Sequence, residues 1–457
     1  MPHQTPDQAH NSSTNSKPHT DLIPTLILSP NKAAIPAQGG HLDVLVRLQA
    51  PDLSADHPAK HTPKRLSLVV DRSGSMSGRP LKEALRCVLH IARHLTPQDQ
   101  VSLVVYDDEV SVLFPLQHMT SIQAIAQAVA DVEEGGSTNL FGGWLAGAEE
   151  LEGGSESSIS RVLLLSDGQA NCGETDVGRI EEHCKQWLAR GVSTTTVGLG
   201  RGFNEELMMA MAREGGGQQY YGQTAADLFD SFDEELALLQ ALYLRKIGLT
   251  LVPEPGVVVE LLSTIQQNDD GSYRMNDLAW GSESWVSLRL HITPSAAGSM
   301  RDLLSFSASG VDLEGRSARH ASKTLQLPVV DLATFNALPA DELVARRAME
   351  VAFGKAAQEL RDLAKRGNRE DTLHSLQQMD ARFGDHPWLK AKMAQLHRLA
   401  EQDMEMMMKE ASFSSMRMSR RLASKSEMMF SADETESEMP AFLRMKVSEG
   451  HGRRNEK

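Results

Sequence analysis

Long apolar runs are missing from this sequence of 457 residues, and cysteine is rare. No apolar stretch approaches the roughly 20 residues that a membrane-spanning helix requires, so we expect no membrane span. The polar beginning, MPHQTPDQAHNSSTNSKPHTD, lacks the basic start and apolar stretch of a signal peptide, which makes a cytoplasmic location the default expectation. The cysteines agree with that location, because an odd and sparse set is neither a disulfide framework nor a paired CxxC zinc motif. They are Cys87, Cys172 and Cys184.

Positive charge is also in deficit. The 46 lysines and arginines oppose 61 aspartates and glutamates, which gives a formal net charge of −15. Nucleic-acid binding leaves a basic footprint, so we expect no nucleic-acid partner. What is present is a hydrophobic fraction of 40%, enough for real cores, in a chain that is long enough for two or three domains.

The chain begins with two regions of different character. Residues 1–20 are polar and predict a disordered tail. Residues 21–63 contain a short apolar run at 26–28 and an alternation of apolar and polar residues at 42–48, with a Pro- and Gly-bearing turn between them. A period of two is typical of a half-buried strand, so this region supplies the first strands of a β-sandwich.

Residues 64–245 follow a different pattern, in which short apolar strands alternate with helices. We expect strands near 66–70, 101–106, 162–166 and 194–198, and helices from residue 80 and near 121–132, 142–151, 179–190, 204–213 and 225–244. This alternation predicts a Rossmann-like α/β fold, a doubly wound parallel sheet with helices on both faces.

Strands without helices return in residues 246–330, near 247–252, 257–262, 286–292, 303–308 and 324–329. Neither this group nor the strands before residue 64 makes a complete sandwich alone. We therefore predict one antiparallel β-sandwich, with the α/β domain inserted between its second and third strands. Residues 331–410 then form a helical region, and residues 411–457, rich in Ser and Met, predict a mostly disordered tail.

The chemistry is concentrated where α/β strands end. Asp71, Ser73 and Ser75 follow the first strand at intervals of two, in a loop that leads into a helix. Ligands of open α/β sheets bind at the carboxyl ends of the strands, so this loop lies in the expected place. One carboxylate and two hydroxyls are hard oxygen donors, which suit Mg²⁺, Ca²⁺ or Mn²⁺ rather than a metal that prefers thiolates.

Two later segments fit the same site. Thr138 lies in a glycine-rich loop before a helix, and Asp167 follows the strand at 162–166. Two carboxylates and three hydroxyls supply only about two negative charges, fewer than a tight metal cage would use. The bound ion would therefore keep its electrophilic character and at least one open position.

The segments DRSGSM at 71–76, GGSTNL at 135–140 and LLSDGQAN at 164–171 resemble the metal ion-dependent adhesion site of von Willebrand factor type A domains. The similarity spans residues 64–245, and the wider arrangement is similar to bacterial cytoplasmic members and to inter-alpha-trypsin inhibitor heavy chains. The resemblance implies one divalent cation, Mg²⁺ first and Ca²⁺ or Mn²⁺ as alternatives. It implies Ser73, Ser75 and Thr138 as the closest ligands, Asp71 and Asp167 acting through water, and an Asp or Glu of a partner protein completing the octahedron.

The expected function is thus metal-dependent protein binding in a cytoplasmic, bacterial scaffold protein, without catalysis. The alternative is a non-hydrolytic subunit of a chelatase or cofactor-insertion complex driven by an AAA+ ATPase, since the chain has no Walker motif. A surface or pilus adhesin is the third possibility, and it conflicts with the expected absence of a signal segment.

Other patterns favour structural roles. His90 and His94 have the i, i+4 spacing of a zinc protease, but Ile91 stands where the catalytic glutamate belongs, so a surface or packing role is expected. Cys184 is expected in a helix core. Asp107 and Asp108 predict a solvated loop, with a place at the rim of the metal site as the alternative. The methionines at 404–408 either extend the third helix or form an adaptable docking surface.

Overall fold

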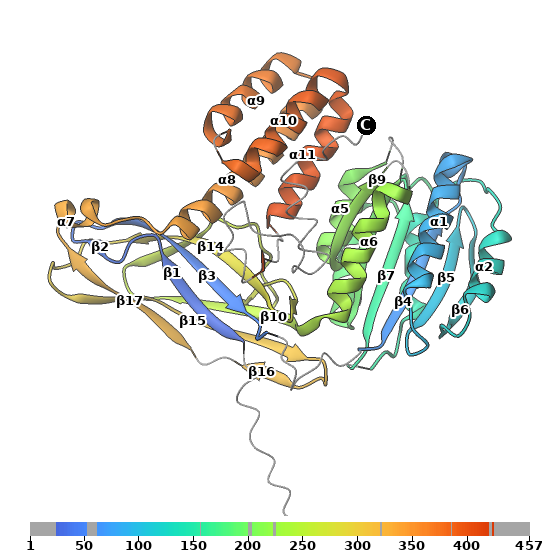
Figure 1. The fold of residues 1–457 in the computed structure, drawn as a ribbon, viewed down its shortest axis with the longest axis horizontal. Helices are drawn as coiled ribbons and strands as arrows, with labels where there is room; N and C mark the ends of the chain where they lie inside the picture. The colour runs from blue at the N-terminus through green and yellow to red at the C-terminus, as the bar shows by residue number, and fades with distance from the viewer. Residues whose placement is uncertain are drawn as a thin grey trace, which may run out of the picture.

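The computed structural model consists of an α/β unit, a β-sandwich and a helical region (Figure 1). The residues that it describes are 24–52, 62–155, 157–199, 203–222, 225–319, 322–384, 386–419 and 423–424. The tail predicted at 1–20, and most of the one predicted at 411–457, lie outside the described residues. No helix in the described part of the chain is both long and apolar enough to span a bilayer.

The sheet of the α/β unit has six strands, of which five are parallel. The six strands lie across the sheet in the order β6 (Val110–His118), β5 (Gln100–Tyr106), β4 (Lys64–Asp71), β7 (Ile159–Ser166), β8 (Val192–Leu199) and β9 (Gly216–Gly222). The predicted doubly wound α/β fold is confirmed. The strands β6 and β9 were not predicted, and β6 adds an antiparallel edge to the parallel sheet.

Helices cover both faces of this sheet. Leu68 and Val70 of β4 point into one apolar core, and Val69 between them points into the other. This alternation explains the nearly continuous apolar sequence of β4, because a strand that is buried on both faces needs apolar residues at every position. The first core is closed by α1 (Arg79–Arg93), α2 (Ile122–Ala130) and α6 (Ala225–Gln240). The second is closed by α3 (Leu140–Glu150), α4 (Val177–Ala189) and α5 (Glu205–Glu214).

The β-sandwich consists of two sheets, whose strands come from the chain segments before and after the α/β unit. One sheet has the order β1 (Thr25–Pro30), β3 (Gly40–Gln49), β14 (Ser282–Ile292) and β11 (Val257–Leu261), with β18 (Ala423–Ser424) beside β14. The other has the order β12 (Tyr273–Arg274), β10 (Leu242–Pro253), β15 (Met300–Asp312), β17 (Lys323–Val330) and β2 (Ile35–Pro36), with β13 (Leu278–Ala279) and β16 (Ser317–Arg319) at its sides.

The strand pairing explains why neither group of strands suffices alone. Val46 of β3 lies opposite Val286 of β14, so strands on either side of the α/β unit are direct neighbours. The insertion that the sequence predicted is therefore present. Its predicted position, after the second strand, was wrong, because the expected turn contains the two-residue strand β2, whose Ile35 is fully buried. The α/β unit follows the third strand.

The last helix of the α/β unit is shorter than expected. The helix predicted at 225–244 ends at Gln240, and Leu242 begins β10. Leu242 and Leu244 are both buried, and their spacing of two is the period of a strand. An apolar pair at that spacing also fits the end of a helical pattern, so the sequence alone did not separate the two elements.

The helical region contains one more long helix than the sequence suggested. Its helices are α7 (Leu332–Ala337), α8 (Glu342–Lys365), α9 (Arg369–Phe383), α10 (Pro387–Gln402) and α11 (Met404–Ser419). The disorder predicted from residue 411 was thus wrong for 411–419. Met407 is fully buried, and Met404 and Met408 pack against the same core, so these methionines hold α11 on the bundle.

The helical region contacts the α/β unit near the carboxyl end of the parallel strands. The ammonium of Lys409 on α11 lies 4.6 Å from the ring centroid of Phe203, and the hydroxyl of Tyr221 donates to Glu410. Phe203 is in the loop between β8 and α5, next to Asn204, whose N–H donates to the carbonyl of Asp167. The helical region therefore contacts one of the loops that surround the predicted metal site.

Candidate metal centre

Asp71 is one of the two predicted ligands that are fully buried, together with Ser73. It is the last residue of β4, it is fully buried, and its Oδ1 accepts the N–H of Ser73 at 2.9 Å. Its Oδ2 accepts the hydroxyl of Ser166 at 2.6 Å and the hydroxyl of Tyr106 at 3.3 Å. Val70 pairs with Leu165 in the parallel register, so the next residues along, Asp71 and Ser166, meet at the same edge of the sheet. Three polar groups thus fix the orientation of this carboxylate.

The electrostatics of the site favour a cation. Burial raises the pKa of Asp71, and the charge of Asp167 raises it further, whereas hydrogen bonds from Ser166 and Ser73 lower it. Burial and the charge of Asp71 also hold the pKa of Tyr106 well above its usual value, so its hydroxyl stays a donor. Among the described residues no lysine, arginine or histidine pairs with Asp71 or Asp167. Two adjacent carboxylates without a counter-charge are costly, and a bound divalent cation removes that cost.

The two serines of the first loop present their hydroxyls to each other. Ser73 caps a single 3₁₀ turn (Gly74–Met76), and its Oγ lies 3.2 Å from the Oγ of Ser75. Ser73 is fully buried, whereas Ser75 is exposed to solvent. The loop therefore offers one hydroxyl from inside the site and one at its mouth.

The second loop is joined to the first by backbone hydrogen bonds. The N–H of Gly74 donates to the carbonyl of Gly136 at 2.9 Å, and the N–H of Gly135 donates to the carbonyl of Arg72 at 2.8 Å. Thr138 follows these glycines and is only 2% exposed. Its loop is thus packed directly against the loop that carries Ser73 and Ser75.

The third loop is joined to the second. The carbonyl of Thr138 accepts the N–H groups of Asn171 and Cys172, both at 3.1 Å, and the side chain of Asn171 accepts the N–H of Thr138 at 2.8 Å. Asp167 begins this loop, is 8% exposed, and accepts the N–H of Gln169 at 3.1 Å. The three segments that carry the predicted ligands therefore form one hydrogen-bonded cluster at the carboxyl end of β4 and β7.

Several residues that support this cluster were not predicted. Ser166, Tyr106 and Asn171 hold Asp71 or Thr138 in place. The available signal was their position beside a predicted ligand, at the end of a strand or in the same loop.

Asp107 is not part of a solvated loop, so that interpretation was wrong. It is 6% exposed, it accepts the N–H of Glu109 at 2.8 Å, and it forms an ion pair with Arg72 at 3.2 Å. A Cβ on Gly135 would lie 1.6 Å from its Oδ2, so the glycine loop passes directly over this carboxylate. Asp107 packs against Gly135 of the second loop, while the neighbouring Asp108 is exposed.

Two of the three cysteines, Cys184 and Cys87, have structural positions. Cys184 is fully buried in the core beneath α4, as predicted, and burial raises the pKa of its thiol. Cys87 is buried in the other core, where burial raises its pKa to about 12. Both thiols remain protonated at neutral pH and are poor ligands and nucleophiles.

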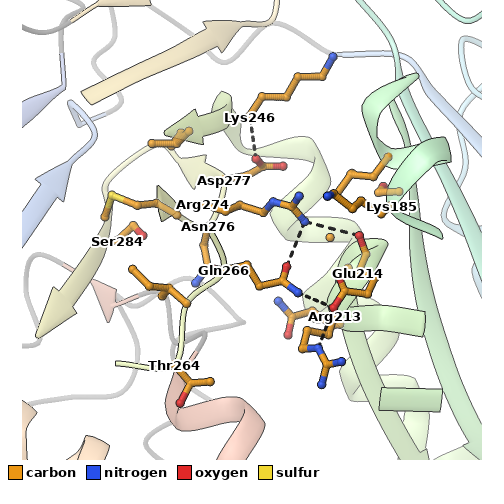
Figure 2. Close-up of a pocket in the computed structure, with 18 of the residues that line it drawn as sticks. Lys185, Arg213, Glu214, Lys246, Thr264, Gln266, Arg274, Asn276, Asp277 and Ser284 are labelled. Carbon is orange, nitrogen blue, oxygen red and sulfur yellow. Dashed lines mark hydrogen bonds and ion pairs between the residues drawn. The ribbon is translucent and has the colours of Figure 1, made fainter. Parts of the chain in front are cut away.

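A cavity of about 1140 Å³ lies at the opposite end of the sheet from this cluster. Its walls come from the starts of β7 and β8, the ends of α4 and α5, and the facing sandwich strands. Figure 2 shows how its polar groups satisfy one another: Arg274 donates to Gln266, Gln266 donates to Glu214, and Asp277 accepts the N–H of Lys246. Because Lys185 and Asp269 form an ion pair at its edge and it lies at the amino ends of β7 and β8, this cavity is a boundary between the units rather than the expected place for a ligand.

Comparison with known proteins identifies the α/β unit. The family model of the von Willebrand factor type A domain matches residues 66–235. An uncharacterized protein of Synechocystis sp. is 25% identical over 217 residues, which are 47% of this chain and 50% of that protein. Inter-alpha-trypsin inhibitor heavy chain H3 of Homo sapiens is 28% identical over 226 residues, 46% of this chain and 24% of that protein. This chain therefore spans half or less of the length of these curated relatives.

Solved structures share most of the architecture. A von Willebrand factor type A protein from Catenulispora acidiphila superposes with a TM-score of 0.69 at 16% identity, over 87% of this chain and 97% of that one. The ArnB paralog VWA2 from Sulfolobus acidocaldarius superposes with a TM-score of 0.54 at 15% identity, over 86% and 98%. At these identities the likeness concerns the fold alone, and it extends beyond the α/β unit. Residues 66–235 of this chain form a von Willebrand factor type A (VWA) domain.

Proposed function

We propose that the VWA domain holds one divalent cation, preferentially Mg²⁺, at Asp71, Ser73, Ser75, Thr138 and Asp167, and uses it to bind a partner protein. The observation that carries this proposal is the convergence of three hydrogen-bonded loops on two carboxylates that have no counter-charge among the described residues. All five side chains offer hard oxygen atoms, the donors that Mg²⁺ prefers.

The partner would supply the missing ligand. The five side chains carry two negative charges in total, so a bound Mg²⁺ is neutralised but not surrounded by anions. Ser75 is exposed while the other four side chains are at most 8% exposed, which leaves one accessible side of the ion. An Asp or Glu carboxylate approaching from that side would complete the coordination, and its bond to the ion would form in a preorganised oxygen shell.

Binding, rather than catalysis, fits the surroundings of the site. The buried groups that touch Asp71 are hydroxyls and a backbone amide, none of which transfers a proton readily at neutral pH. Within the described residues no histidine or lysine belongs to the cluster, and Cys172 contacts it through its backbone N–H. The site therefore supplies an electrophile and a fixed geometry, without a general acid or base.

The decisive experiment removes one hydroxyl and keeps the fold. Thr138→Val retains the side-chain volume and both backbone hydrogen bonds of the loop to Asn171 and Cys172. We expect its affinity for Mg²⁺ or Mn²⁺, measured by titration calorimetry, to fall at least about tenfold. Capture of the Mg²⁺-dependent partner from a cell lysate should fall with it, and a chelator should abolish capture by the wild type.

Ser137→Ala is the matched control, because Ser137 is the exposed neighbour of Thr138 in the same loop. It should bind metal and partner like the wild type. Equal metal affinity for Thr138→Val and the wild type would refute the ligand set. Normal metal binding with chelator-insensitive partner capture would refute the role of the ion.

The partner identified in this experiment also decides between scaffold and complex subunit. Recovery of an AAA+ ATPase would favour the non-hydrolytic subunit of a chelatase or cofactor-insertion complex. A cytoplasmic location remains a prediction from the sequence, and cell fractionation tests it.

A further inference from the structure

A second cluster of metal-binding side chains lies outside the VWA ligand set, between α1 and α6. His90 is on α1, His94 ends that helix, and Asp233 is on α6, 143 residues from His90 in sequence. The two helices pack side by side over the same core. The sequence showed only the histidine pair, and the fold brings the carboxylate to it.

The three side chains converge on a common point. Nε2 of His90 lies 2.8 Å from Oδ1 of Asp233, and Nε2 of His94 lies 3.7 Å from the same oxygen. The ligand atoms of all three are within 4.8 Å of one another. A tetrahedral ion with bonds of about 2.0–2.2 Å holds its ligand atoms about 3.4 Å apart. Small side-chain rotations are enough to reach that geometry.

The orientation of both imidazoles is fixed by other contacts. Nδ1 of His94 lies 2.9 Å from the carbonyl oxygen of His90, which can only accept, so Nδ1 carries the proton and Nε2 keeps its lone pair. The ring of His90 stacks on Phe229, with centroids 4.1 Å apart and planes 6° from parallel. Metal-binding histidines commonly have such partners, because these set the tautomer and the ring plane.

We propose that His90, His94 and Asp233 bind one Zn²⁺ ion, which cross-links α1 and α6 independently of the Mg²⁺ site. Two imidazoles and one carboxylate suit a borderline metal such as Zn²⁺ and disfavour Mg²⁺, which prefers oxygen ligands alone. The side chains of His94 and Asp233 are 46% and 45% exposed, so water fills the remaining coordination position.

The location gives this ion a structural consequence. The helix α1 follows the loop of Ser73 and Ser75, and a single residue separates the end of α6 from β10 of the sandwich. An ion between them ties the helix next to the Mg²⁺ site to the helix that leads out of the VWA domain. Because the ligands come from both helices, Zn²⁺ binds the folded state more tightly than the unfolded chain and stabilises it.

The test is a Zn²⁺ titration of the full chain without an affinity tag, in excess Mg²⁺ so that the first site stays occupied. The variants are His94→Gln and Asp233→Asn, which change side chains that are 46% and 45% exposed. We expect the tightest Zn²⁺ equivalent seen by calorimetry to weaken at least about tenfold in each. The rise in melting temperature caused by Zn²⁺ should disappear in both variants.

His118→Gln is the matched control, since His118 is an exposed histidine at the end of β6 in the same domain. It should keep the wild-type affinity and the Zn²⁺-induced rise in melting temperature. The proposal is overturned if His94→Gln and Asp233→Asn bind Zn²⁺ like the wild type. It is equally overturned if His118→Gln loses as much affinity, because the binding would then belong to surface histidines in general.

Discussion

Replacing Ser166 with alanine tests how the site is supported, because it removes a hydroxyl that holds Asp71 and leaves all five proposed ligands in the chain. Ser166 is fully buried at the end of β7. Its hydroxyl donates to Oδ2 of Asp71 at 2.6 Å and accepts the N–H of Gly168 at 2.8 Å. The substitution therefore leaves a buried carboxylate oxygen with only the longer bond from Tyr106, and it leaves a buried amide without its acceptor.

The expected magnitudes follow from these two bonds. A hydrogen bond to a charged group contributes about 1.5–3 kcal/mol, and a buried donor left unsatisfied costs about 1–3 kcal/mol. We expect Ser166→Ala to lower the free energy of unfolding of the VWA domain by about 2.5–6 kcal/mol, the sum of the two effects. We expect the affinity for Mg²⁺ to fall about 10–100-fold, as it does when other metal sites lose a group that orients a ligand.

Titration calorimetry with Mg²⁺ and thermal unfolding with and without Mg²⁺ measure the two effects. Ser102→Ala is the control, because Ser102 is equally buried in the same sheet and its hydroxyl donates to the neutral hydroxyl of Ser67 at 2.9 Å. It should cost about 1 kcal/mol of stability and leave the metal affinity unchanged. The reasoning fails if Ser166→Ala binds Mg²⁺ like the wild type, or if Ser102→Ala weakens binding by the same factor.

Two further predictions concern the support of the loops and the acid stability of the domain. Gly135→Ala should abolish Mg²⁺ binding in calorimetry, because its Cβ would collide with the buried Asp107. Gly136→Ala should bind Mg²⁺ normally, because its Cβ would meet only the exposed and movable side chain of Asp108. Equal Mg²⁺ affinities of the two variants would contradict this prediction. Burial by itself raises the pKa of Asp99, but hydrogen bonds from Thr96 and Lys64 and the charge of Lys64 lower it below its usual value. A carboxylate whose pKa is lower in the folded than in the unfolded chain stabilises the fold at pH values above its unfolded pKa of about 3.9. This stabilisation is lost as the pH falls through the pKa of the folded state. The melting temperature of Asp99→Asn should therefore lie below that of the wild type at pH 7 and approach it below about pH 4, and a constant difference across this range would contradict the assignment.

Helices and strands whose apolar residues follow a clear pattern were predictable from the sequence, and those without such a pattern were not. The strand β4 is apolar at nearly every position from Leu66 to Val70, which predicted burial on both faces. The strand β6 is half exposed and contains Pro115, which a strand tolerates at a sheet edge, and β9 consists mainly of glycine, glutamine and tyrosine. Both are held in place by their neighbours β5 and β8 rather than by their own sequence.

The same distinction applies to α11. Its residues 411–419 are rich in serine and methionine, so their composition predicted disorder, and residues 420–422 and 425–457 lie outside the described part of the chain. Helix formation there depends on packing against α8 and α10, which a local pattern does not contain. Propensity is a weak prior wherever tertiary contacts supply most of the stability.

The sequence by itself determined the α/β alternation and the interrupted sandwich, and it supplied the five oxygen-bearing side chains of the proposed metal site, because these depend on periods and residue types within short segments. Only the tertiary structure decided which groups surround them. The donation from Ser166 to Asp71, the support of Gly135 by Asp107, and the approach of Asp233 to His90 and His94 each join residues that are distant in sequence. Such contacts depend on sheet register and helix packing, which are properties of the assembled chain.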